Sequence, residues 1–328
     1  MRYAASFFIS LAVTIVMGFL LIPLLRRLKA GQRIKRDGPV WHLSKEGTPT
    51  MGGLMFIAGL LAAVVLTGLP DFRAGNYSGL AMLGFALVQG VIGFLDDFEK
   101  VKKRGNQGLK GAQKFLLQLV VAVAFVLLLR YLGFLSPNLY IPFLDVVIPL
   151  PEPLYVAFAA FVIVGTVNAV NLTDGVDGLV SGVSLPVAAC FFALAVCWGQ
   201  RPQALFAAGL AAGLMGFLLF NFHPAKVFMG DTGSLFLGGC LCALAFGLDM
   251  PLVLVPLGVV YIIEALSDII QVGYFKLSHG KRVFKMAPIH HHFEKSGWSE
   301  TRIFVVFTGV SLVFALLTWL GVRGRYGL

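Results

Sequence analysis

Runs of about 20 apolar residues recur along this chain, and they limit its fold more than any other feature. A helix needs about 20 apolar residues to cross the roughly 30 Å of hydrocarbon in a bilayer. Ten runs meet or approach that length, and they are 3–25, 51–69, 78–95, 114–134, 153–170, 179–197, 203–220, 235–248, 252–275 and 301–321. The sequence therefore predicts an all-α, polytopic integral membrane protein with about ten transmembrane helices.

The composition supports this prediction, since 58% of the residues are hydrophobic and 13% are charged. The first run ends in Arg26 and Arg27 without a small-residue cleavage pattern, so we expect a retained span rather than a signal peptide. The eighth run is short, and Glu264 and Asp268 interrupt the ninth. No linker or low-complexity tract divides the chain, so residues 1–328 are expected to form a single transmembrane domain.

The basic residues predict an orientation. Of 26 Lys and Arg residues, 20 fall in or beside alternate connections and six fall on the other side. The positive-inside rule places the basic connections in the cytoplasm and both termini outside. For Arg26, Arg27 and Lys29, an equally good interpretation is that they only set topology or attract anionic lipid.

The acidic residues gather on the same side as the basic ones. Twelve of the 16 Asp and Glu residues lie with the basic connections, although acids contribute little to orientation. Their concentration needs another cause, and we infer a functional site at the cytoplasmic face.

Asp231 lies at the centre of the polar segment 221–239. Gly230 precedes it, and Thr232, Gly233 and Ser234 follow. Glycines let a ligand approach the backbone closely, and carboxylate and hydroxyl oxygens suit a hard cation. This segment is therefore predicted to bind Mg²⁺ through Asp231.

Two further polar segments lie at helix ends. Thr50 and the glycines near it lead into the second span, where backbone amides suit an anion and Lys45 could neutralise a phosphate; the alternative is a plain helix-entry turn. Asp96 and Asp97 close the third span, where adjacent carboxylates face the negative end of the helix dipole. Unless this is simply a solvated helix end, the pair is expected to meet Mg²⁺, a lysine or a transferable proton.

The segment 168–178 places polar groups at every third residue before its glycines break the helix. Asn171, Asp174 and Asp177 could hydrogen-bond to the edge of a base or to sugar hydroxyls, and Gly175 would leave the backbone amides accessible. The alternative is a tight loop, which would explain the glycines but not the carboxylates.

In the ninth span, Glu264, Asp268 and Gln271 share one helix face and should point into a polar cavity. Three consecutive histidines follow, His290, His291 and His292. Neighbours on a helix point about 100° apart, so phosphate binding is favoured over a zinc site. The four cysteines show no metal-ligand spacing and are expected to be small buried hydrophobes.

The motifs occur in an order that resembles a known family. They are GTPTMGG at 47–53, LDD at 95–97, NLTDGVDGL at 171–179, PAKVFMGDTGSL at 224–235 and APIHHHFE at 287–294. Together they resemble the polyprenyl-phosphate N-acetylhexosamine 1-phosphate transferases, and the triple histidine resembles the phospho-N-acetylmuramoyl-pentapeptide branch.

The resemblance implies a catalytic domain in the bacterial cytoplasmic membrane that makes lipid I and UMP from UDP-MurNAc-pentapeptide and undecaprenyl phosphate with Mg²⁺. It also implies that the protein contacts membrane lipid, that it binds no nucleic acid, and that a homodimer is plausible. It implies catalytic roles for Asp96, Asp97, Asp231 and His290, with Asp231 as metal ligand. It implies substrate-binding roles for Lys45, Thr50, Lys114, Asn171, Asp174, Gly175, Asp177, Asn221, Phe228, Gln271, His291 and His292.

Two questions stay open at this point. The lipid phosphate could attack directly with help from Asp96 or Asp97, which we favour, or a carboxylate could attack first to form an acyl-phosphate. The alternative functions are a transferase of N-acetylglucosamine 1-phosphate to a polyprenyl phosphate and, in a different class, an ion or phosphate transporter.

Overall fold

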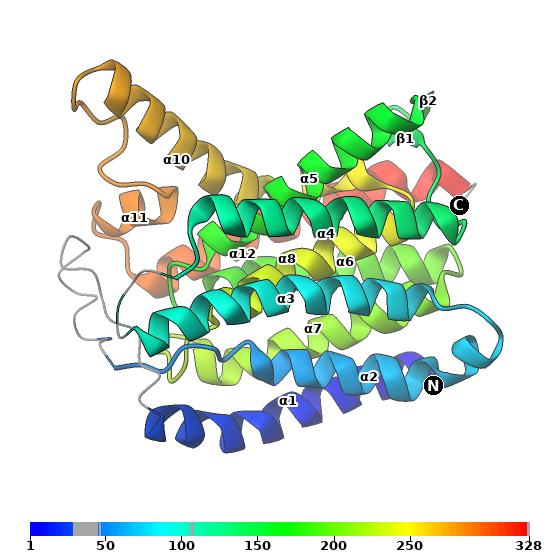
Figure 1. Ribbon diagram of the computed structural model, residues 1–328, viewed down its shortest axis with the longest axis horizontal. Coiled ribbons are helices and arrows are strands. Elements are labelled where there is room, and N and C mark those ends of the chain that lie inside the picture. The colour runs from blue at the N-terminus through cyan, green and yellow to red at the C-terminus, as the bar shows by residue number, and fades with distance from the viewer. Residues whose placement is uncertain (29–44, 46, 104, 106–107, 327–328) are drawn as a thin grey trace.

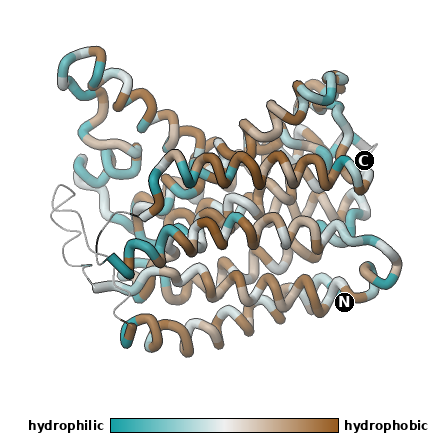
Figure 2. The backbone as a smooth tube through the Cα atoms, in the orientation of Figure 1, coloured by the Kyte–Doolittle hydropathy of each residue, from teal (hydrophilic) through white to brown (hydrophobic). Residues whose placement is uncertain are grey.

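A bundle of long helices makes up most of the computed structural model, which describes residues 1–28, 45, 47–103, 105 and 108–326 (Figure 1). Within these residues nine helices are long and apolar enough to cross a membrane. They are α1 (Arg2–Arg27), α2 (Leu54–Arg73), α3 (Ser78–Lys102), α4 (Gly111–Tyr131), α5 (Glu152–Thr173), α6 (Leu179–Cys197), α7 (Arg201–Asn221), α8 (Gly230–Gly247) and α12 (Glu300–Val322). Figure 2 shows these helices as largely hydrophobic, with hydrophilic residues concentrated towards their ends.

The ninth predicted span is bent. It consists of η2 (Pro251–Val253) and α9 (Leu254–Leu257), followed by α10 (Val259–Leu277), with an angle of 80° at the break. The break lies at Gly258, after a proline in α9, whereas Glu264 lies within regular helix. Glu264 and Asp268 interrupt the apolar run but not the helix, because sharp bends arise at residues such as proline and glycine rather than at acidic side chains.

The predicted eighth span also differs at its start. Helix α8 begins at Gly230, five residues before the predicted 235, and so includes Asp231 and Thr232 in its first turn. The polar segment around Asp231 thus includes the N-terminal turn of a membrane-spanning helix.

Four short elements were not predicted. Strands β1 (Asn138–Ile141) and β2 (Val146–Pro149) pair antiparallel between α4 and α5. Helix α11 (Ile289–Glu294) carries the three histidines, and η3 (Arg323–Tyr326) follows α12. The hairpin adds a small β element to an otherwise helical fold.

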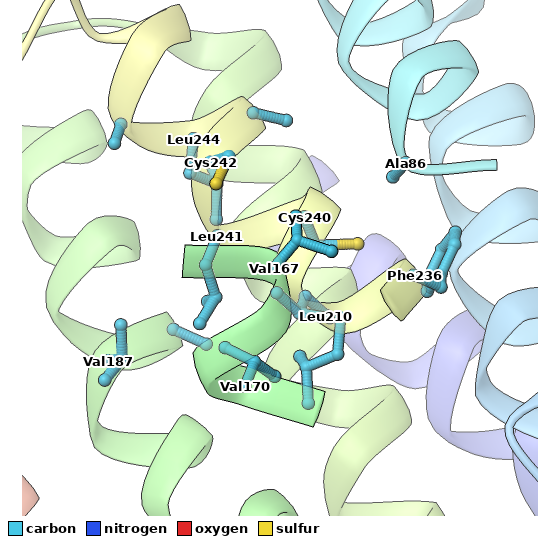
Figure 3. Packing of buried hydrophobic residues seen from close by; sticks show 14 of the residues in the cluster. Ala86, Val167, Val170, Val187, Leu210, Phe236, Cys240, Leu241, Cys242 and Leu244 are labelled. Atoms are coloured by element: carbon cyan, nitrogen blue, oxygen red, sulfur yellow. The ribbon is translucent and has the colours of Figure 1, made fainter. Parts of the chain in front are cut away.

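Helix α8 forms the centre of the core. Its residues after Asp231 are buried, and it packs against α3 and α5 (Figure 3). A Cβ at Gly238 would lie 2.7 Å from Val167 Cα, and one at Gly239 would lie 3.1 Å from Ala86 Cα. Small residues let helix backbones approach closely in membranes, where apolar burial gives little preference between protein and lipid.

The cysteines follow the expectation with one exception. Cys190, Cys240 and Cys242 are buried, but Cys197 is exposed at the end of α6. The N-terminal end of α1 and the C-terminal end of α12 lie at the same end of the bundle, and α11 lies at the other (Figure 1).

Candidate active site

Four helices end or begin at the α11 side of the bundle and bring polar side chains together there. The C-terminal turns of α3 and α5 meet the N-terminal turns of α4 and α8 at this end (Figure 1). They supply Asp96, Asp97, Asn171, Lys114 and Asp231, which lie far apart in the sequence.

Three carboxylates form the centre of the site. Asp96, Asp97 and Asp231 each place an oxygen within 4.8 Å of the others. Lys100 Nζ lies 2.5 Å from Asp96 Oδ2 and 3.0 Å from Asp231 Oδ2, while Lys114 Nζ lies 2.8 Å from the same Asp231 oxygen. Two ammonium groups therefore offset the mutual repulsion of three acids.

Asp97 binds the N-terminus of α8. Its Oδ1 accepts the Asp231 N–H at 3.2 Å, and its Oδ2 accepts the Thr232 N–H at 2.9 Å and the Thr232 hydroxyl at 2.7 Å. The first amides of a helix have no intrahelical acceptors, and the helix dipole favours an anion there. The Asp97 carboxylate thus joins α3 to α8 directly at the site.

Asp96 and Asp231 share Lys100, but their other partners differ. Asp96 Oδ1 accepts the Leu109 N–H at 2.8 Å, and Asp231 Oδ1 accepts from Asn171 Nδ2 at 2.9 Å. The same Asn171 nitrogen lies 2.7 Å from the Ser234 hydroxyl oxygen. Asn171 therefore orients the Asp231 carboxylate from α5.

The segment before α2 lies beside the same helix terminus. Phe228 N donates to Pro49 O, and Gly52 N donates to Phe228 O, both at 2.8 Å. A Cβ at Gly230 would lie 2.6 Å from both Thr50 Oγ1 and Asp97 Oδ2. Thr50 is thus placed at the carboxylate cluster, and the half-buried Phe228 lies next to it.

A second polar cluster contains Lys45 and Asp177. Lys45 Nζ lies 2.7 Å from Asp177 Oδ1 and 2.6 Å from Glu300 Oε2. His223 Nδ1 lies 3.1 Å from Asp177 Oδ2. Asn221 supports the turn, because its Oδ1 accepts the Gly178 N–H at 3.1 Å. Lys45 therefore lies beside Asp177, with Glu300 and His223 as two partners that the sequence did not suggest.

Asp174 lies in the turn after α5, between the two clusters. Burial raises the pKa of its carboxyl well above the usual range, and the negative charges of Asp231, Asp97 and Asp177 raise it further. These two effects stabilise the protonated form of Asp174.

His290 lies against the same turn. Its Nδ1 is 3.0 Å from Glu264 Oε2, and both residues are buried. A Cβ at Gly175 would overlap His290 Nε2, so the ring touches the backbone of the turn. Glycine is required there by this contact.

The remaining predicted residues make other contacts. Gln271 Nε2 donates a hydrogen bond to Phe284 O, and Gln271 Oε1 accepts from the N–H groups of Val283 and Phe284. These bonds stabilise the loop after α10. His291 Nδ1 lies 2.6 Å from Glu294 Oε2, and His292 Nδ1 accepts from Lys285 N at 3.1 Å. The histidines thus have separate partners, as their helical spacing predicts.

Sequence reasoning missed several members of the site. Lys100 follows Asp96 by four residues, a spacing at which charges pair on a helix, and that signal was present. Glu300 and His223 carry no comparable signal, because their contacts with Asp177 depend on how α12 and the turn after α7 pack.

The carboxylate cluster has the chemistry of a site for a hard divalent cation. Mg²⁺ prefers oxygen ligands from one or two carboxylates and completes its shell with water and phosphate oxygens. Asp231 is half-buried, and two lysines face its carboxylate. The carboxylate oxygens suit a cation, and the two ammonium groups beside them suit an anion. Asp177, His223 and Glu300 also bring ligand atoms together, but Lys45 already binds both carboxylates.

Comparison with known proteins agrees with this geometry. Residues 79–249 match the model of glycosyl transferase family 4, which makes the chain a membrane-embedded member of a transferase family. Residues 45–57 match signature 1 of the phospho-N-acetylmuramoyl-pentapeptide-transferases.

Three curated relatives carry that enzyme name. The protein of Clostridium acetobutylicum is 44% identical over 96% of this chain and 97% of its own length. That of Geobacillus thermodenitrificans is 46% identical over 94% of each chain, and one from Listeria monocytogenes is 42% identical over 96% of each. The chain belongs to the phospho-N-acetylmuramoyl-pentapeptide-transferase family. This membership confirms the resemblance and favours the transferase over the transporter.

Proposed function

We propose that this protein transfers phospho-N-acetylmuramoyl-pentapeptide from its UDP-linked form to undecaprenyl phosphate, giving lipid I and UMP. The observation that carries the proposal is the cluster of three carboxylates and two lysines at one end of a membrane-spanning bundle. A reaction between a water-soluble nucleotide and a membrane lipid needs charged groups at such a boundary.

The cofactor in this proposal is Mg²⁺, held by Asp231 with Asp96 or Asp97 close enough to assist. When bound, it would offset the negative charge of the diphosphate. Lys100 and Lys114, which pair with the carboxylates in this structure, would then be free to contact phosphate oxygens. Phosphoryl transfer depends mainly on positioning and charge stabilisation, and these side chains supply both.

The nucleotide is proposed to lie along the turn after α5 and the segment before α8. Asn171, Asp174, Gly175 and Asp177 line the turn, Asn221 supports it, and Phe228 would stack on uracil. Lys45, Thr50 and Lys114 would contact phosphates. Gln271, His291 and His292 are proposed to bind the sugar or phosphates through the loop and helix that carry them.

We favour direct attack by the lipid phosphate. Both oxygens of Asp97 accept hydrogen bonds from α8, and both oxygens of Asp96 have partners as well. A carboxylate engaged in this way is a weak nucleophile, whereas a lipid phosphate is already charged. Trapping a phosphorylated aspartate from the nucleotide substrate alone would overturn this preference.

The test is release of UMP in detergent with purified protein, Mg²⁺ and polyprenyl phosphate. We expect release from UDP-MurNAc-pentapeptide to require both additions. Preference for UDP-N-acetylglucosamine would favour the related transferase instead, and no release from either nucleotide would refute the proposal.

Replacing the proposed metal ligand is a sharper test. Asp231→Asn should lower kcat by about 10²-fold or more, because one ligand charge is lost where negative charge must be offset. Thermal unfolding in detergent should confirm that the variant is folded, and normal turnover in a folded variant would remove Asp231 from the metal site.

The distribution of basic residues predicts the location of the reaction. We propose one catalytic domain over residues 1–328 in the bacterial cytoplasmic membrane, with the site on the cytoplasmic face and both termini outside. A homodimer stays a prediction, which the mass of the detergent-purified protein would test.

A further inference from the structure

Glu264, one partner of a buried ion pair at the site, has no assigned role. Glu264 on α10 is 0% exposed and His290 on α11 is 1% exposed. Glu264 Oε2 lies 3.0 Å from His290 Nδ1 and 3.4 Å from His290 N. Within the described residues, His290 is the one ion-pair partner of Glu264.

The pair is incompletely satisfied, and both unsatisfied atoms are of interest. Glu264 Oε1 and His290 Nε2 are buried without a hydrogen-bond partner in the structure. Burying a carboxylate is costly even when it is paired, and a second unpartnered atom adds to that cost. An apolar residue would pack in this position more favourably, so stability does not explain Glu264.

The chemistry of the contact fixes the ring. An ionised carboxylate accepts hydrogen bonds and donates none, so the imidazole nitrogen that faces an ionised Glu264 carries a proton. This holds whether the ring is neutral or protonated. The other nitrogen, Nε2, is therefore the one that can exchange a proton or a hydrogen bond with a ligand.

The free nitrogen faces the proposed substrate turn. Gly175 has no side chain, and a Cβ on it would overlap His290 Nε2, so this nitrogen lies directly against the glycine. Asp174 belongs to the same turn, and Asn171, in the last turn of α5 before it, bonds Asp231. A ligand bound at this turn would lie next to His290 Nε2.

We propose that Glu264 is a positioning residue for the transfer reaction. It holds His290 in the tautomer that presents Nε2 to the turn, and it acts through the histidine rather than on the substrate. This inference deepens the proposed function, and the kinetic experiment that tests it rests on that function. The same arrangement of carboxylate and histidine orients the general base of serine proteases, where an amide in place of the carboxylate favours the wrong tautomer.

The first experiment uses Glu264→Gln, which has nearly the same shape but can donate to Nδ1. We expect kcat to fall by about 10²-fold or more, as for loss of a general acid or base, with KM for the nucleotide changed by less than about threefold. Glu152→Gln removes the same charge at the outer end of α5, where Arg130 pairs with it, and should leave kcat unchanged. Unchanged kcat in folded Glu264→Gln would overturn the proposal.

The second experiment reads the ring directly, without substrate. The chain has six histidines, so ¹⁵N-histidine NMR in detergent gives a countable spectrum, and His290→Gln assigns the signal of interest. We expect a proton on Nδ1 of His290 in the unaltered protein and its loss or redistribution in Glu264→Gln. A lowered kcat with an unchanged His290 signal would show that Glu264 acts by another route, which would overturn the proposal.

Two further outcomes are distinguishable. If the unaltered protein releases no UMP, the proposed function fails, while the NMR comparison still tests the contact between Glu264 and His290. If Glu264→Gln does not fold, Glu264→Asp replaces it: the shorter carboxylate should lower kcat at least about 10-fold, and an unchanged kcat would overturn the proposal.

Discussion

Two adjacent aspartates at the end of α3 have different structural roles. Asp97 accepts three hydrogen bonds from the start of α8, so its carboxylate is part of the contact between two helices. Asp96 pairs with Lys100 and the Leu109 amide at the edge of the same cluster. Asp97 therefore links α3 to α8 at the site, whereas the partners of Asp96 lie on α3 itself and in the segment before α4.

Phe228 provides a residue-scale test of nucleotide binding. Stacking of a base on an aromatic ring contributes about 1–3 kcal/mol, so Phe228→Ala should raise the Kd for UMP by roughly 5- to 150-fold. Isothermal titration would measure it. Phe161→Ala removes an exposed ring from α5 and serves as the control. Equal affinities in the two variants would count against stacking.

Asp174 predicts a pH dependence of stability. An unfolded aspartate titrates near pH 3.9, while the pKa of folded Asp174 is raised. Between these values the folded protein binds the extra proton, so stability falls as pH rises through the folded pKa. Asp174→Asn cannot ionise and should therefore unfold at a higher temperature than the unaltered protein, by a margin that grows with pH.

Thermal unfolding without nucleotide or Mg²⁺, from about pH 4 to 8, would measure this margin. Asp145→Asn removes an exposed carboxylate at the hairpin and controls for general charge effects. A margin that shrinks with pH would contradict the raised pKa.

At the scale of elements, the contact between α3 and α8 brings the carboxylates together. Both helices carry glycines on the shared face, and the site lies where the C-terminal end of one meets the N-terminal end of the other. A Cβ at Gly93 would overlap the Asp231 carbonyl oxygen. The backbones are in contact there, so the spacing of Asp96, Asp97 and Asp231 depends on this glycine.

Gly93→Ala should therefore separate the helices and weaken the site. Overpacking of this kind costs about 1–3 kcal/mol or more, and we expect a lower unfolding temperature together with a lower kcat. Gly84→Ala is a matched control on the same helix, because a Cβ there meets no atom within 4 Å. Equal effects of the two substitutions would argue against close contact at Gly93.

At the scale of the whole molecule, opposite ends of the bundle have different roles. The polar clusters and α11 lie at one end, while the hairpin and both chain ends lie at the other (Figure 1). Cys197 is the one exposed cysteine of the four, and it lies at the end of α6 away from the turn that carries Asp177. This native thiol can report which end faces outside.

A membrane-impermeant maleimide should label Cys197 in spheroplasts. A cysteine at the exposed position 296, made by Ser296→Cys, should be labelled instead in inside-out vesicles, since it follows α11 at the site end. Cys197→Ser removes the background in the second case. Labelling of both positions from the same side would contradict the proposed topology.

The sequence by itself determined the class of fold and the chemistry of the site. Long apolar runs have few stable alternatives to membrane-spanning helices, and polar residues between them need a function to be retained. Asp96, Asp97, Asp231 and Asn171 were proposed as site residues in this way, and the structure brings their side chains together.

Only the tertiary structure decided which groups meet. The pairing of Asp97 with the start of α8, of Lys45 with Glu300, and of Glu264 with His290 depends on helices that pack side by side from distant parts of the chain. Periodicity shows which face of a helix a residue occupies, but the neighbour of that face is chosen by close packing of backbones at glycines such as Gly93. The contact between His290 on α11 and Glu264 on α10 was settled by the packing of those helices.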